Sequence, residues 1–128
     1  MARKRYQTQT AETLLGEDGI VRVKMFSDTR ESLADAKENI AVFARLCDGR
    51  KRPVMIDLGG SRSISQDARR YYSGEEAGRH ICASALIVGS PVSRVLGSFF
   101  LGLNKPAYPV RLFTSEAEAI KWLKEFGP

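Results

Sequence analysis

The chain has 128 residues, 43% hydrophobic and 27% charged, which is enough for one soluble domain with a single core and needs no stapling cross-links. Its net charge of +5 does not indicate nucleic-acid binding, because Arg3, Lys4 and Arg5 account for much of the excess over the 15 acidic residues. Nucleic acid is therefore not an expected partner. No segment approaches the ~20 consecutive apolar residues that span a bilayer, so a membrane span is not expected either.

The first eleven residues carry the basic cluster and no apolar periodicity. We therefore predict a flexible tail over 1–11 and one domain over 12–128. The polar run Tyr6–Thr10 follows the basic residues, so no secretory signal is expected. Cys47 and Cys82 lack metal-binding spacing, which is typical of small buried residues in a reducing compartment. These features predict a cytoplasmic protein.

The first predicted elements are strands over 12–16 and 20–25, joined by an acidic, glycine-containing turn into an antiparallel hairpin. Apolar and polar residues alternate in the second strand, which indicates that one face meets solvent. Ser32 or Asp28 is expected to cap the helix that follows. The apolar residues of that helix have the spacing of one helical face: Leu33, Ala36, Ile40, Phe43, Ala44 and Cys47.

Three further strand–helix pairs complete the predicted order. The strands are expected over 54–58, 81–88 and 110–113, and the helices begin after Ser65, Ser90 and Ser115. The strand over 81–88 is the most apolar, so we place it at the centre of the sheet. Strands that alternate with helices indicate parallel pairing. The prediction is an α/β fold with about five mostly parallel strands, an antiparallel N-terminal hairpin and four helices.

The stretch 53–67 runs from a buried strand through Gly59-Gly60 to a serine-capped helix. Loops at the carboxyl ends of parallel strands commonly bind ligands and partners. The free N–H groups of the helix start, with Arg62, would favour a small anion, which the negative charge of Asp67 opposes. The candidate interaction or ligand residues of this stretch are Ser61, Arg62, Ser63, Ser65 and Asp67.

The predicted helix over 91–103 has an apolar stripe, Val92 to Leu103, that we assign to the core. Its opposite side carries small or apolar residues, Arg94 is its one charged residue, and interior glycine disfavours a helix. This predicts that a second subunit, a protein partner or an apolar ligand covers Arg94, Gly97 and Leu101. Alternatively, the chain's own residues 6–15 cover that side.

Several blocks of the sequence resemble an uncharacterised bacterial family described as STAS-like. These are the strand ending at Asp57, Ala68–Tyr72, Ser90–Arg94, Phe99–Pro106, and the two closing blocks Pro109–Phe113 and Ala119–Leu123. The resemblance covers about residues 12–126. It implies the STAS fold of bacterial anti-sigma-factor antagonists and a regulatory or binding module.

In those antagonists, phosphorylation of a serine at the start of the second helix breaks a protein–protein contact. The corresponding position here is Asp67, and no glycine follows it. An aspartate there is either a permanent, weaker mimic of phosphoserine or an ordinary first-turn residue that favours the helix dipole.

Residues that could catalyse a reaction do not form a recognisable set. His80 is the sole histidine, and Asp57 at a strand end is expected to accept hydrogen bonds from the following loop. We therefore predict a non-enzymatic regulatory protein–protein interaction module without metal or cofactor, which binds a protein partner or its own copy. The alternative is a carrier of a small molecule or lipid, since lipid-binding domains of CRAL-TRIO type share this strand–helix plan.

Overall fold

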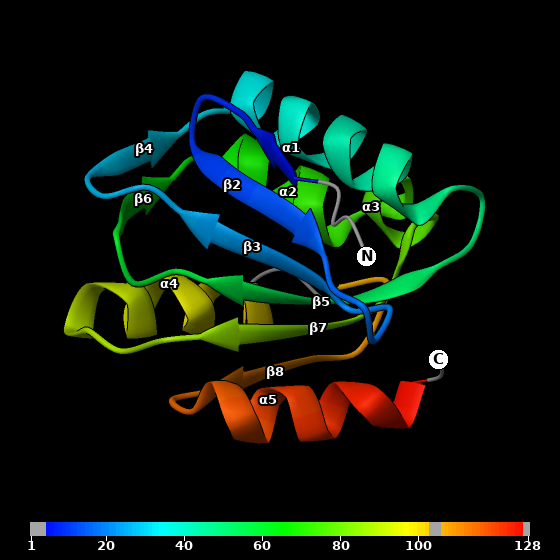
Figure 1. Cartoon of the computed structure of the whole chain (residues 1–128). Helices are drawn as coiled ribbons and strands as arrows, with labels where there is room; N and C mark the ends of the chain where they lie inside the picture. Colours follow the sequence, from blue (N-terminus) through cyan, green and yellow to red (C-terminus); the bar gives the residue numbers. More distant parts are fainter. Residues whose placement is uncertain (1–4, 103–105, 127–128) are drawn as a thin grey trace.

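The computed structural model describes residues 5–102 and 106–126, with the backbone alone for 99–102. Within the described residues, six strands form one sheet (Figure 1). Its spatial order is β1 (Arg5–Gln7), β2 (Ala11–Leu15), β3 (Val21–Met25), β5 (Arg52–Asp57), β7 (Ile81–Ile87) and β8 (Val110–Phe113). The first three strands are antiparallel neighbours, whereas β3, β5, β7 and β8 run parallel.

Helices cover both faces of this sheet. One face is covered by α1 (Leu33–Cys47), α2 (Gln66–Ser73) and α4 (Pro91–Gly102), and the short α3 (Glu75–Gly78) follows α2. The other face is covered by α5 (Glu116–Leu123), which ends in a 3-10 turn, η1 (Lys124–Phe126) (Figure 1). The core on the α5 side consists of small and apolar residues: Ile20, Met55, Ala83, Ala85, Ile87, Ala119 and Leu123.

The five predicted strands and four predicted helices are confirmed. The strand predicted at the sheet centre, β7, is instead the second strand from one edge, next to β8. It is buried because helices cover both faces of the sheet. Serines cap the helices as expected: Ser32, rather than Asp28, begins α1 in a capping box with Asp35, and Ser65 begins α2. Asp28 instead has a left-handed backbone, with φ of 61°.

The N-terminal segment differs from its prediction. Residues 5–7 form β1 and pair with β2, and both Thr10 and Ala11 are buried. The ring of Tyr6 packs on the core, and β1 satisfies the backbone groups of the β2 edge. The boundary predicted at residue 12 is therefore wrong, since the folded domain includes 5–11; residues 1–4 lie outside the described part.

A small second sheet lies where a loop was predicted after β5. It pairs β4 (Thr29–Glu31) in parallel with β6 (Ser61–Ile64). The Asp28 N–H donates to the Gly60 carbonyl at 2.7 Å, and a Cβ on Gly60 would lie 2.9 Å from the Cα of Ser27. The absence of a side chain at Gly60 thus allows the two segments to approach closely.

The face that α4 turns to the core is only partly the predicted one. Leu96 is buried as predicted, but Val92 and Val95, also expected in the core, are 50% and 54% exposed. Ser93 and Gly97, expected on the opposite side, are buried. A Cβ on Gly97 would lie 2.8 Å from Cδ2 of Leu112, so glycine lets the helix lie close to the sheet. In the described part of the chain, no helix is both long and apolar enough to cross a membrane.

Candidate binding surface and buried cavity

One candidate site is the edge of the sheet where the parallel strands β3, β5 and β7 end. The chain there continues into Phe26, the Gly59-Gly60 turn and the start of α4. Phe26 is 36% exposed, and the Arg62 guanidinium donates to the Asp28 carboxylate at 2.7 Å on the surface. Asp57 behaves as predicted, because its carboxylate accepts the Gly59 N–H at 2.9 Å.

The candidate residues of the 53–67 stretch are in different environments. Arg62 and Asp67 are exposed, and Ser63 is half-buried. Ser65 uses its hydroxyl to accept the Ala68 N–H at 3.1 Å. Ser61 is only 3% exposed, so the prediction that it presents a hydroxyl at the surface is wrong: its position in β6 turns the side chain inward.

The candidate residues of α4 also separate. Arg94 is exposed, but Gly97 is buried against Leu112 and Val88, so the prediction that a partner covers it is wrong. The sheet of the same domain makes the close approach that the glycine allows. The third residue predicted to be covered is Leu101, and its side chain lies outside the described residues.

A different apolar surface takes the place of the predicted one on α4. We define the outer face of α4 as the two exposed side chains Val92 and Val95, which are three residues apart and so lie on one side of the helix. Exposed apolar side chains that neighbour each other on a helix are typical of a contact surface. Arg94 extends beside it toward a groove that Arg111 and Trp122 also line.

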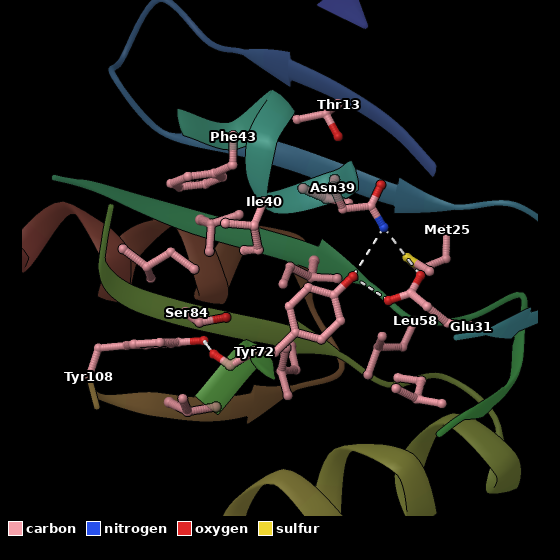
Figure 2. A pocket seen from close by; sticks show the side chains of 17 residues that line it. Thr13, Met25, Glu31, Asn39, Ile40, Phe43, Leu58, Tyr72, Ser84 and Tyr108 are labelled. Carbon is pink, nitrogen blue, oxygen red and sulfur yellow. Dashed lines mark hydrogen bonds between the residues drawn. The ribbon is translucent and has the colours of Figure 1, made fainter. Parts of the chain in front are cut away.

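The second candidate site is a cavity of about 60 Å³ between the sheet and the helices α1 and α2 (Figure 2). Most of its lining is apolar, three polar side chains gather at one end, and Thr13, Ser84 and Tyr108 line it elsewhere. Figure 2 shows Glu31, Asn39 and the Tyr72 hydroxyl together at the polar end, while Phe43 and Tyr108 lie toward the other end.

The polar end of the cavity is built around the carboxylate of Glu31, which is 3% exposed. It accepts hydrogen bonds from the Thr10 hydroxyl at 2.8 Å, from the Asn39 amide at 3.2 Å and from the Tyr72 hydroxyl. Burial raises the pKa of the Glu31 carboxyl above its ordinary value, while these hydrogen bonds act in the opposite direction.

The surrounding residues fix this arrangement. The Tyr108 hydroxyl donates to the Tyr72 carbonyl at 2.6 Å, and the Thr8 hydroxyl donates to Oδ1 of Asn39 at 2.5 Å. Burial also raises the pKa of both tyrosines, so their hydroxyls stay protonated and can donate. Side chains from five elements or turns of the chain thus form the cluster, and their hydrogen bonds fix the orientation of the carboxylate.

The sequence patterns do not predict this cluster. One signal for it exists: Asn39 lies on the inner face of α1, three residues after Ala36 and four before Phe43, where an apolar residue is normal. A buried amide needs hydrogen-bond partners, so its position indicates buried polar neighbours. Which neighbours these are depends on the tertiary structure.

His80 and the two cysteines, the remaining candidates for chemistry, do not form a reactive site with one another in the described part of the chain. His80 lies 3.8 Å from the Glu76 carboxylate, and Cys47 is buried, where burial raises the pKa of its thiol to about 12. Cys82 is partly buried and, like Cys47, free of a disulfide. Within the ranges that the structure describes, no three His, Cys, Asp or Glu side chains are placed to hold a metal ion.

Comparison with known proteins places the chain as follows. A family model described as a domain of unknown function, DUF7793, matches residues 14–127. The chain is similar in structure to an uncharacterized protein of the DUF3478 family with a SpoIIAA-like fold, from Shewanella loihica PV-4. That likeness has a TM-score of 0.56 and 17% identity, and it covers 95% of this chain and 92% of the other. No curated protein matches.

A protein of unknown function from Arthrobacter sp. FB24 also matches, with 32% identity, 92% of this chain and 95% of that chain covered, and a TM-score of 0.36. The likeness to the Shewanella protein confirms the predicted STAS-like α/β fold. A shared fold does not by itself assign a function, which has to be argued from the site.

Proposed function

The chain belongs to the DUF7793 family, and we propose that it is a bacterial, cytoplasmic regulatory module that binds a protein partner without catalysis. The observation that carries this proposal is the outer face of α4, with Val92 and Val95 half exposed. Between Pro91 and Gly102 this helix has one charged residue, Arg94, whereas an ordinary surface helix carries several.

The charges around this surface would orient the partner. Arg94 lies beside the outer face of α4, and the Arg62–Asp28 ion pair lies at the same edge of the sheet. Exposed ion pairs contribute little to stability, but charges at the rim of a contact influence association rate and partner choice. Asp67 adds a fixed negative charge at the start of α2, where the antagonists that this chain resembles carry a phosphorylatable serine.

The test begins with capture of the tagged protein's companion from its source organism. The companion is then purified, and its dissociation constant is measured with the wild-type chain and with Val95→Asp. A charge on the outer face of α4 should weaken binding by at least about tenfold, because it would be buried unpaired. The control is Ala34→Asp, at an exposed position of α1.

The results separate the alternatives. If both variants weaken partner binding equally, or if neither weakens it, the proposed surface is contradicted. If the protein instead binds a second copy of itself, a dimer mass is seen that Val95→Asp abolishes. That result would support the outer face of α4 as the contact surface and would identify the partner as the chain itself. A monomer with a small bound molecule instead supports the carrier function, for which the cavity beside Glu31 is the specific observation.

A further inference from the structure

The buried cavity is large enough for a small molecule. Its volume of about 60 Å³ is several times the ~10–15 Å³ that one water needs, and it is below the ~150 Å³ of an apolar cavity that accepts benzene. A compact molecule with a few non-hydrogen atoms fits this space, whereas a lipid does not. The cavity is thus distinct from the surface proposed for a protein partner.

The polar end of the cavity holds an acidic side chain, Glu31, and no basic side chain among the described residues that line it. The three donors to Glu31 are neutral groups. The charge of Asp35, which is also negative, contributes to the raised pKa of the Glu31 carboxyl. A carboxylate buried without a cation is costly, and a positively charged ligand would offset that cost.

The carboxylate can accept a further hydrogen bond. Its two oxygens have about four acceptor positions, and the Thr10, Asn39 and Tyr72 side chains use three of them. The rest of the lining is mainly apolar and runs away from Glu31 along the sheet, past Ile40 to Phe43 (Figure 2). A charged donor at one end and an alkyl chain behind it would match this lining.

We propose that the cavity binds a short alkylammonium ion, with its ammonium group on the Glu31 carboxylate and its alkyl chain against the apolar walls. Charge complementarity selects this class. An alcohol of the same length keeps the apolar contacts and loses the charge, and a carboxylate of the same length is repelled by Glu31. The proposal does not depend on a protein partner.

The experiment is an NMR titration of the isotope-labelled full chain at neutral pH with n-propylammonium, n-propanol and propionate. Propylammonium should shift the amide signals of residues that line the cavity at a concentration at least about tenfold lower than propanol, because a charged hydrogen bond is added. Propionate should leave these signals unchanged. Equal affinity for the alcohol and the ammonium ion, or shifts only at surface carboxylates, would overturn the proposal.

Substitution tests the role of the carboxylate. Glu31→Gln keeps the shape of the side chain and should abolish the preference for propylammonium over propanol, whereas Glu38→Gln, on the exposed side of α1, should keep it. If Glu31→Gln does not fold, the titration of the wild-type chain decides alone: signals of the residues that line the cavity must shift at a lower concentration of propylammonium than of propanol, and their failure to do so overturns the proposal. Val95→Asp should leave propylammonium binding unchanged, so failure here and failure of the protein-partner proposal are distinguishable.

Discussion

The hydroxyl of Tyr72 donates a hydrogen bond to the carboxylate of Glu31, and so connects α2 to the end of β4 inside the domain. The amide of Asn39 donates to both groups, at 3.0 Å to the Tyr72 hydroxyl and at 3.2 Å to the carboxylate. Two helices and the small sheet therefore meet at one buried charge. Their relative positions depend on a few hydrogen bonds as well as on apolar packing.

Tyr72→Phe should lower the free energy of unfolding by about 1.5–3 kcal/mol, because the buried carboxylate loses a donor while the ring still packs. Urea denaturation measures this change. The matched control is Tyr71→Phe, at the neighbouring tyrosine, for which the structure shows no hydrogen bond to a described residue. It should change the stability by less than about 0.5 kcal/mol. Similar losses in both variants would show that the hydrogen bond to Glu31 has no special weight.

Glu31 should make the stability depend on pH with a defined sign. Burial raises the pKa of its carboxyl in the folded chain above the ordinary value of 4.5, so the folded chain holds this proton more tightly than the unfolded one. The contribution is complete below about pH 4.5 and is lost as the pH rises through the folded pKa. Relative to Glu31→Gln, the wild type should therefore lose stability above about pH 4.5, by at most about 1.4 kcal/mol per pH unit.

Denaturation of the two proteins at several pH values between 4 and 8 measures this difference. Because other titrating groups are common to both proteins, their contributions cancel in the comparison. A difference that stays constant over this range, or that shifts in favour of the wild type as the pH rises, would contradict the assignment of a raised pKa to Glu31.

Gly60→Ala should destabilise the fold by about 1–3 kcal/mol, because the new Cβ meets rigid backbone. It would lie 2.9 Å from the Cα of Ser27 and 3.0 Å from the carbonyl oxygen of Phe26. Gly89→Ala is the control, since a Cβ there has no atom within 4 Å. Thermal denaturation of both variants tests this, and a Gly60→Ala protein as stable as Gly89→Ala would show that the β4–β6 contact adjusts without cost.

Local sequence features predicted most of the elements. The apolar spacing of residues 36–47 and the capping serine Ser32 place α1, and Ser65 and Ser115 place the starts of α2 and α5. These features act within one or two helical turns, so neighbouring residues are sufficient to identify them. The weak strands β4 and β6 were missed because each is short and exists through its pairing with the other.

The inward face of α4 could not be read from the sequence. Its two sides both consist of small or apolar residues, so periodicity does not distinguish the core side from the exposed one. The close packing of Gly97 on Leu112 and Val88 decides it, because that side permits the helix to approach the sheet. The same packing leaves Val92 and Val95 at the surface.

The α/β class, the order of the principal elements and most helix starts follow from the sequence, since these depend on local spacing and backbone hydrogen bonding. The buried cluster and the cavity depend on tertiary packing. Glu31 and Tyr72 are separated by 41 positions, and burial of the carboxylate needs donors from distant segments at the same point. Long-range packing brings these donors together, and the free energy of a buried charge depends on all the groups that surround it.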